Sequence, residues 1–339
     1  MKRTLSLTLA ILFMLSLLSA CSGGTGGSTT AATLATTTAA TTTTAATTAA
    51  TTTTAATTAA TTTTAVTTTA EPVEEPYYSH IVCSSIAAAE IIVELGLGDS
   101  LVCVNNYALD IPGLPEGIAA MDFMAPNPEG VMGFEPDLFI EFDYIVEDGS
   151  YQALLEAQVD ILPVSVSSDS VEDIANDIMF LANALGVPSR GEELVETMQA
   201  EVDRLTAIGA SIPEEERKTV YFEIAPAPSI FCVGGDTFIG DMLHRVGAVN
   251  IFEDLQGFAT PSEEELLTRN PDVILTNVTY VEDAVGEICG RTGYDKIAAV
   301  ENGDVYTIDA NATSRPTHNV VKAIAAIGEA VYPEYFGND

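Results

Sequence analysis

The chain has 339 residues, of which 49 are acidic and only 12 are lysine or arginine, giving a formal net charge of −37 at pH 7. Such an acidic surface argues against nucleic acid and against anionic lipid as partners. The placement of the basic residues is also uneven, because none occurs between Arg3 and Arg190. The first folded part of the chain therefore offers no fixed positive charge to a ligand.

The first twenty residues predict an export signal. Lys2 and Arg3 precede an apolar stretch, residues 5–20, that ends in Leu-Ser-Ala before Cys21. Basic residues, a short apolar core and small residues before a cysteine are typical of a bacterial lipoprotein signal. We expect a signal peptide over residues 1–20, lipidation of Cys21, and contact with the membrane only through that lipid.

Residues 25–70 are almost entirely threonine and alanine. Such a segment has no large apolar side chains to bury and cannot offset its ordering entropy. We therefore predict a disordered tether over residues 21–76, with a root-mean-square span of roughly 40 Å. Its length suits a domain held out through the cell wall of a Gram-positive-type bacterium. Whether the tether carries O-linked sugars stays open.

Strand-like and helix-like segments alternate through the rest of the chain, which predicts α/β lobes with parallel sheets covered by helices. Ser189 is the expected N-cap of a helix of about 20 residues, long enough to pass from one lobe to the other. The expected boundaries are an N-terminal lobe over 77–188, an interlobe helix over 189–210 and a C-terminal lobe over 211–339. The expected strands are 80–85, 101–104, 160–166, 218–224, 273–276 and 304–308, and the expected helices include 87–97, 151–158, 237–246, 262–269 and 319–331.

One motif occurs twice, 135 residues apart. In each copy a glutamate, Glu129 or Glu264, stands seven residues before a Pro-Asp pair that opens an apolar run. Asn127 and Ser262 are the expected N-caps, and Ser262 is expected to form a capping box with Glu265. The proline then ends the short helix, and the apolar run is a buried strand. Two related lobes follow from this repetition, with one glutamate in the first turn of an equivalent helix on each.

The chain resembles a substrate-binding lipoprotein of an ABC importer, in the class that carries iron–siderophore complexes, haem and vitamin B12. The resemblance covers about residues 78 to 336. It rests on the two Glu…Pro-Asp motifs and on the stretches 81–98, 237–250 and 300–306. It implies the class III periplasmic-binding-protein fold, in which a single long helix joins two α/β lobes and the ligand is held in the cleft. It also implies that Glu129 and Glu264 dock with arginines on the two permease subunits. The alternative is that each glutamate only stabilises a helix N-terminus.

We expect the ligand to contact loops at the carboxyl ends of the strands, where open α/β sheets bind ligands. Met124 resembles an axial iron ligand of haem-carrying members, but the second lobe lacks the matching histidine, so Met124 is a metal ligand only if haem is bound. Arg291 is the candidate for an anionic group. The absence of tryptophan removes a residue that often stacks on corrin rings. The expected ligand-binding residues are Tyr107, Phe123, Met124, Tyr144, Asp236, Phe258, Asn277 and Arg291.

We therefore expect a monomeric, lipid-anchored, extracytoplasmic protein that captures an iron chelate, of siderophore or haem type, for an ABC permease dimer and its ATPase subunits. A cobalamin carrier, or an adhesion or sensory lipoprotein with the same fold, stays open. No enzyme motif, intrinsic cofactor or metal site is expected. Buried free thiols are favoured over disulfides for the remaining cysteines, Cys83, Cys103, Cys232 and Cys289, although an exported chain permits bridges.

Overall fold

The computed structural model describes residues 76–165 and 169–337. The expected signal peptide, Cys21 and the tether up to residue 75 lie outside the described residues. Within the two described ranges, no helix is both long and apolar enough to cross a membrane.

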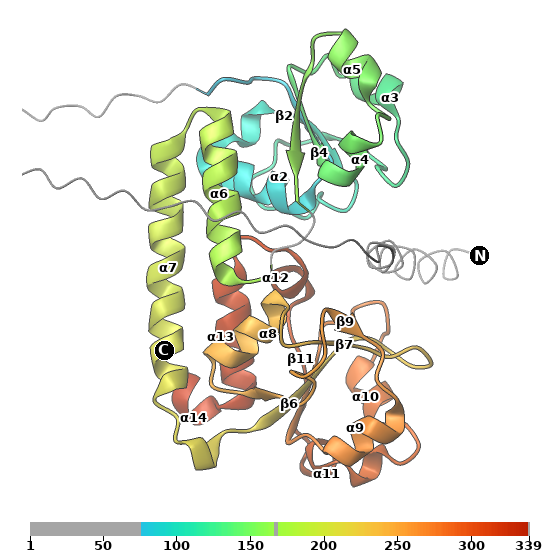
Figure 1. Cartoon of the computed structure of the whole chain (residues 1–339), viewed down its shortest axis with the longest axis vertical. Coiled ribbons are helices and arrows are strands. Elements are labelled where there is room, and N and C mark those ends of the chain that lie inside the picture. The colour runs from blue at the N-terminus through green and yellow to red at the C-terminus, as the bar shows by residue number, and fades with distance from the viewer. Residues whose placement is uncertain (1–75, 166–168, 338–339) are drawn as a thin grey trace, which may run out of the picture. The chain divides into compact units, whose positions relative to one another are not determined.

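The first lobe contains five parallel strands in the order β3-β2-β1-β4-β5 (Figure 1). Because all five run the same way, their carboxyl ends share one edge of the sheet. The strands are β1 (Ile81–Cys83), β2 (Leu101–Asn105), β3 (Ala119–Met121), β4 (Leu138–Phe142) and β5 (Asp160–Val164). The helical segments are α2 (Ile86–Ile92), η1 (Val93–Leu97), η2 (Gly98–Ser100), α3 (Pro128–Met132), α4 (Asp143–Glu147) and α5 (Gln152–Glu156).

The second lobe contains a mixed sheet in the order β11-β10-β6-β7-β9, with β8 also paired to β6. Strands β6, β8, β10 and β11 are parallel, whereas β7 runs antiparallel to both β6 and β9, so the sheet is mixed around a parallel set of strands. The strands are β6 (Thr219–Ala225), β7 (Phe231–Val233), β8 (Val249–Asn250), β9 (Phe258–Ala259), β10 (Val273–Thr276) and β11 (Val305–Thr307). The helical segments are η3 (Glu214–Glu216), α8 (Phe238–Arg245), α9 (Glu263–Arg269), α10 (Ala284–Cys289), η4 (Tyr294–Lys296), α11 (Ala298–Asn302), α12 (Ala310–Ser314), α13 (Val320–Val331) and α14 (Pro333–Phe336).

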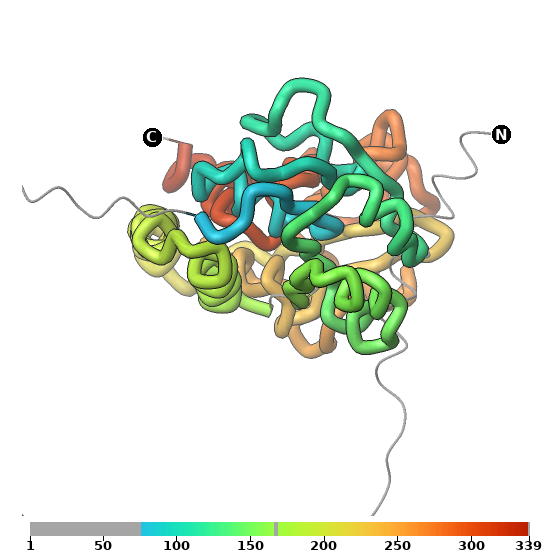
Figure 2. The backbone as a smooth tube through the Cα atoms, turned by 90° about the horizontal axis from the view of Figure 1, so that it is seen from above, coloured from blue at the N-terminus to red at the C-terminus, as the bar shows by residue number. Residues whose placement is uncertain are grey.

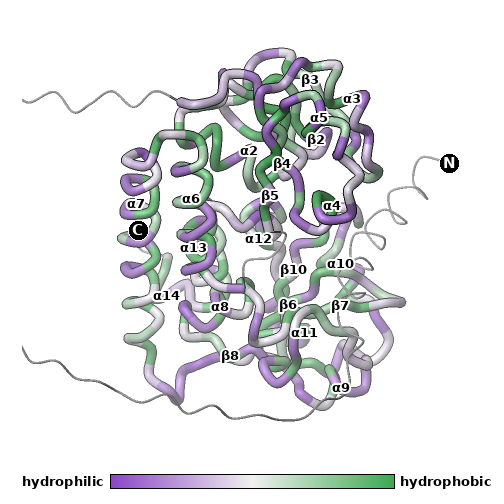
Figure 3. The backbone as a smooth tube through the Cα atoms, turned by 45° about the horizontal axis from the view of Figure 1, so that its top comes forward, coloured by the Kyte–Doolittle hydropathy of each residue, from purple (hydrophilic) through white to green (hydrophobic). Residues whose placement is uncertain are grey.

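Two helices, α6 (Val171–Leu185) and α7 (Pro188–Ala210), lie side by side (Figures 1 and 2). The long helix α7 is the predicted interlobe helix, but its N-cap is Val187 and not Ser189. Pro188 occupies the first helical position, where its missing N–H leaves no unsatisfied donor. The strands of both sheets are mostly hydrophobic, whereas hydrophilic and hydrophobic segments alternate along α7 (Figure 3).

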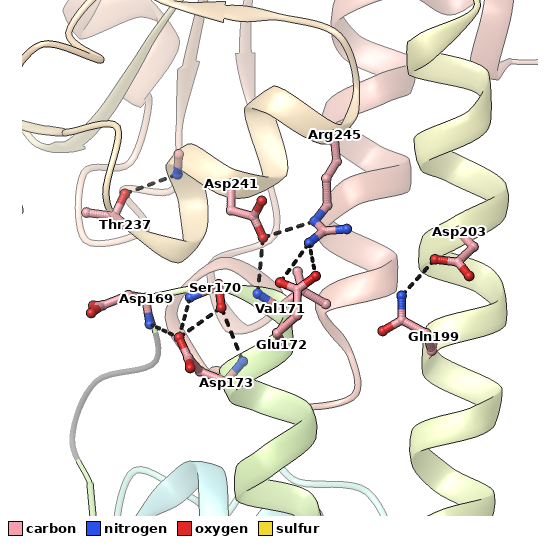
Figure 4. A network of polar contacts seen from close by, with 11 residues as sticks. Asp169, Ser170, Val171, Glu172, Asp173, Gln199, Asp203, Thr237, Asp241 and Arg245 are labelled. Atoms are coloured by element: carbon pink, nitrogen blue, oxygen red, sulfur yellow. Dashed lines mark hydrogen bonds and ion pairs between the residues drawn. The ribbon is translucent and has the colours of Figure 1, made fainter. Parts of the chain in front are cut away.

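The N-terminus of α6 is fastened to the second lobe by polar contacts (Figure 4). Asp241 of α8 accepts a hydrogen bond from the backbone N–H of Val171 at 3.1 Å and pairs with Arg245. The same arginine pairs with Glu172 in the first turn of α6 at 2.9 Å. Because the body of α6 packs on α2 of the first lobe, both α6 and α7 contact both lobes.

Both copies of the duplicated motif fold as short capped helices. The side chains of Asn127 and Ser262 cap α3 and α9, as predicted. The expected capping box is only half formed, because the carboxylate of Glu265 pairs with Arg269 at 2.7 Å. The Glu265 carboxylate can bind either Arg269 or the backbone N–H of the N-cap residue Ser262. In this structure it binds Arg269.

The aspartate of each Pro-Asp pair binds the start of the first strand in its lobe. Asp137 accepts hydrogen bonds from the backbone N–H groups of Ser79 at 2.8 Å and His80 at 2.9 Å. Asp272 accepts from the N–H and the hydroxyl of Thr219, at 2.8 and 2.6 Å. These contacts tie β4 to β1 and β10 to β6, the central parallel pairs of the two sheets.

We predict that Asp137→Ala and Asp272→Ala each lower the free energy of unfolding by about 1–2 kcal/mol, because the first removes a charged acceptor from three donors and the second from two. Urea denaturation followed by circular dichroism measures the change. Asp295→Ala, at an exposed position in η4, is the control and should change stability by less than about 0.5 kcal/mol. Equal stability of all three variants would show that the Pro-Asp carboxylates do not hold the strands.

Candidate ligand-binding site

Exposed large apolar side chains gather in segments that follow the carboxyl ends of parallel strands. We call these segments the carboxyl edges: residues 106–118, 122–126 and 143–150 in the first lobe, and residues 277–283 and 308–319 in the second; they include the short helices α4 and α12. Nine large apolar residues are exposed in the described part of the chain, and five of them lie in these segments. The five are Tyr107, Leu109, Met124, Tyr144 and Tyr280. Exposed apolar groups concentrated in this way are typical of a binding surface.

The carboxyl edges of the two lobes touch each other through one charged pair. The Arg315 guanidinium donates to both carboxylate oxygens of Asp110, at 2.8 and 3.1 Å, and to the backbone carbonyl of Tyr107 at 3.3 Å. The Asn311 amide also donates to Asp110, at 2.8 Å. Burial opposes ionisation of Asp110, but the bonds from Arg315 and Asn311 outweigh it and lower the pKa of the carboxyl.

Near the carboxyl end of β6, the second lobe buries an ion pair. Arg291 donates to both oxygens of Glu223 at 2.7 Å and also pairs with Glu287. The Arg291 side chain is only 7% exposed and the Glu223 side chain 1% exposed. Burial opposes the charge of Arg291, yet its hydrogen bonds to Glu223 and Glu287 raise its pKa.

At the carboxyl end of β4, the first lobe buries a carboxyl group without a cation. Glu141 is 0% exposed. Its Oε1 accepts from the hydroxyl of Ser84 at 2.6 Å and from the N–H of Phe142 at 2.8 Å, while its Oε2 has no hydrogen-bond partner. Burial raises the pKa of Glu141, against the opposing effect of these donors and of the Tyr151 hydroxyl.

Three of the expected ligand-binding residues, Tyr107, Met124 and Tyr144, lie exposed in the first lobe's carboxyl edge. The Tyr144 ring stacks on Phe142, with centroids 6.0 Å apart. Phe123, which follows β3, lies instead in the core: it is 8% exposed and stacks on Phe139.

In the second lobe, Asn277 lies in the carboxyl edge but is bonded to α12 through the hydroxyls of Thr313 and Ser314. Arg291 is already paired with two carboxylates, so the structure does not leave it free to receive an anionic ligand.

The structure does not bring Asp236 to the carboxyl edge. Strand β7 begins beside the carboxyl end of β6, with Phe231 opposite Ala225, and runs away from it. Asp236 follows the far end of β7, accepts from the N–H of Gly257, and lines an open hollow of about 610 Å³. Phe258 lies on β9, which pairs antiparallel with β7; it stands opposite Val233 and is half-buried. The sequence pattern did not reveal that β7 reverses direction, so both residues lie away from the strand ends at which they were expected.

Sequence reasoning missed Tyr280 and the Asp110–Arg315 contact. Tyr280 follows β10 by four residues, so its place after a strand end was a usable signal. Arg315 and Asp110 are 205 residues apart in the chain, and no local sequence pattern predicts a contact between such distant residues.

All four cysteines in the described part of the chain are free, and three of them are buried. The thiols of Cys83, Cys103 and Cys232 have raised pKa values, chiefly because of burial, which makes them poor nucleophiles and metal ligands. The described residues contain no cluster of three histidine, cysteine or acidic side chains arranged to hold a metal ion.

The profile of a periplasmic binding protein family matches residues 81–312. The chain belongs to this periplasmic binding protein family. The resemblance, the two-lobed α/β fold and the expectation of a binding protein rather than an enzyme are thereby confirmed.

Individual relatives are distant. An uncharacterized ABC transporter substrate-binding lipoprotein, YvrC of Bacillus subtilis, is 27% identical over 73% of this chain and 78% of its own length. A vitamin B12-binding protein of Vibrio parahaemolyticus is 25% identical over 76% of this chain and 90% of its own. The crystal structure of a possible iron-binding protein from Staphylococcus epidermidis matches with a TM-score of 0.66 and 26% identity, over 75% of this chain and 99% of that one.

We predict that Glu141→Gln reduces the pH dependence of stability. A carboxyl whose pKa is raised by folding favours the folded state below its unfolded pKa, and this contribution is lost as pH rises through the folded value. Wild-type protein should therefore lose more stability between pH 5 and pH 8 than Glu141→Gln, as measured by urea denaturation. The exposed Glu196→Gln variant is the control and should follow the wild type. Identical profiles for all three proteins would show that Glu141 is ionised in the folded state.

Proposed function

We propose that this protein is the extracytoplasmic, lipid-anchored substrate-binding component of an ABC importer, and that it captures a metal chelate for a membrane permease. The observation that carries the proposal is the gathering of Tyr107, Met124, Tyr144 and Tyr280 in the carboxyl edges of both lobes. Aromatic faces and a thioether suit a large, partly apolar complex. The names of the relatives, which include vitamin B12-binding and possible iron-binding proteins, support the same class of cargo.

The favoured cargo is an iron chelate of siderophore or haem type, and a cobalamin is the alternative within the family. We predict that at least one of a ferric hydroxamate, a ferric catecholate, haem and cobalamin binds with a Kd below about 10 μM, measured by calorimetry. Tyr144→Ala should weaken that binding roughly tenfold, because the exposed ring, which stacks on Phe142, offers a large contact area. If haem binds, Met124→Ala should remove its axial ligand signal.

Failure of the whole panel to bind would contradict the chelate proposal and favour the adhesion or sensory lipoprotein. Tyr77→Ala is the matched control, because this exposed tyrosine lies outside the carboxyl edges. If it weakened binding as much as Tyr144→Ala, the proposed site would be wrong.

The second part of the proposal is that Glu129 and Glu264 contact the two permease subunits. Both are exposed and lie in the first turns of α3 and α9. Each helix leads through a short turn into a central strand and therefore runs back along it, which directs its N-terminus toward the carboxyl edge. Each lobe then presents one exposed acid that lies outside the carboxyl edges defined above.

We predict that the double variant Glu129→Arg, Glu264→Arg abolishes uptake and leaves chelate affinity unchanged within about twofold, because it opposes positive charges on the permease without touching the site. Uptake by cells and calorimetry on purified protein give the two readouts. The control is Glu192→Arg with Glu196→Arg, the same charge change on exposed residues of α7. Normal uptake by the docking variant would leave the two glutamates as helix-end residues only.

A further inference from the structure

The positive charges near the cargo site are few. Ten of the 12 lysines and arginines follow Arg3, and none of the ten precedes Arg190. The whole first-lobe edge, with Tyr107, Met124 and Tyr144, therefore contains no cation. In the described part of the chain, two arginines reach the strand ends of the second lobe, Arg315 after β11 and Arg291 beside β6.

Arg315 is held by the first lobe. One nitrogen of its guanidinium contacts both oxygens of Asp110 and the carbonyl of Tyr107, and the side chain is 12% exposed. The Asn311 amide donates to Oδ2 of the same carboxylate at 2.8 Å. An anionic group of a ligand would have to displace Asp110 or approach next to its negative charge, and both are unfavourable.

Arg291 is compensated even more completely. Glu223 binds it through both oxygens and Glu287 binds it as well, so two negative charges surround one positive charge. Burial makes the pair costly to break, because an unpaired buried carboxylate would remain. Neither arginine is thus left to neutralise a ligand carboxylate or phenolate.

We propose that the site selects metal complexes that are neutral or cationic, with amide- or hydroxamate-like peripheries, and that Asp110 sets this selectivity by keeping Arg315 neutralised. This inference rests on the proposed function as a chelate-binding protein. The net charge of −37 acts in the same direction, because it repels polyanions on approach.

The test measures the affinities of four probes by calorimetry: ferrioxamine B and cyanocobalamin as complexes without net negative charge, and haemin and ferric dicitrate as anions. Wild-type protein should bind its best neutral or cationic probe at least about tenfold more tightly than either anion. Asp110→Asn keeps an oxygen acceptor for Asn311 but removes the charge, and should raise affinity for the anions about tenfold. That gain should shrink with added salt.

Arg315→Gln distinguishes the effect of an exposed positive charge from the effect of losing the contact between the lobes. Like Asp110→Asn it breaks the Arg315–Asp110 ion pair, but it leaves no cation behind. It should give no gain for anions, and Glu196→Gln, which removes one remote negative charge, should give none either. Lowering the pH to 5 should not mimic Asp110→Asn, because the pKa of Asp110 is lowered.

The possible results separate the two proposals. An anionic probe that binds wild-type protein best, or equal gains in Asp110→Asn and Arg315→Gln, would overturn the selectivity inference and leave the chelate-binding function standing. Binding of none of these probes, and of no ferric catecholate, would overturn both.

Discussion

The register of the central parallel strand pair is the constraint on which both lobes depend. Parallel strands are joined by long crossovers, so no tight turn fixes their alignment. In this protein a carboxylate fixes the alignment of each pair. Asp137 accepts hydrogen bonds from the start of β1, and Asp272 accepts them from the start of β6. A slip of one residue would turn every side chain of the strand to the other face and move Glu141 away from Ser84. The geometry of the carboxyl edges is thus set at the opposite, amino ends of the strands.

The same register places one buried carboxyl group on an inner strand of each sheet, Glu141 on β4 and Glu223 on β6. The hydrogen-bond donors around the two carboxyl groups differ. In the second lobe, burial raises the pKa of Glu223 against the opposing effect of two hydrogen bonds from Arg291. Glu141 has only neutral donors, because the chain contains no basic residue between Arg3 and Arg190. Replacing a buried ion pair by apolar residues often costs little stability. The Glu223–Arg291 pair is therefore better understood as orienting groups near the strand ends than as a source of stability.

Much of this architecture was readable from sequence, because it rests on local chemistry. The caps at Asn127 and Ser262, the helix ends before the two Pro-Asp pairs and the long helix α7 all follow from residues close in the chain. The features that were missed depend on distant partners or short elements. Strands β7 and β9 have three and two residues, too few for a hydrophobic period, and their antiparallel course displaced Asp236 and Phe258 from the expected site. Arg291 was recognised from the sequence as a positive charge, but the sequence did not reveal its pairing with Glu223 and Glu287.

Contacts join the two lobes at more than one place, and they limit how far the lobes could move apart when a ligand binds. Arg245 holds Glu172 at the start of α6, Arg315 holds Asp110 at the carboxyl edges, and Asn319 donates to the buried Glu90 at 2.6 Å. A wide hinge motion would have to break several of these contacts together, since α6 and α7 both reach from lobe to lobe. Docking through one acid per lobe requires a nearly fixed spacing between the two acids, and contacts of this kind would maintain it. Under the proposed function, a cargo bound at the carboxyl edges would therefore account for more of the difference between loaded and empty protein than a large change in lobe orientation.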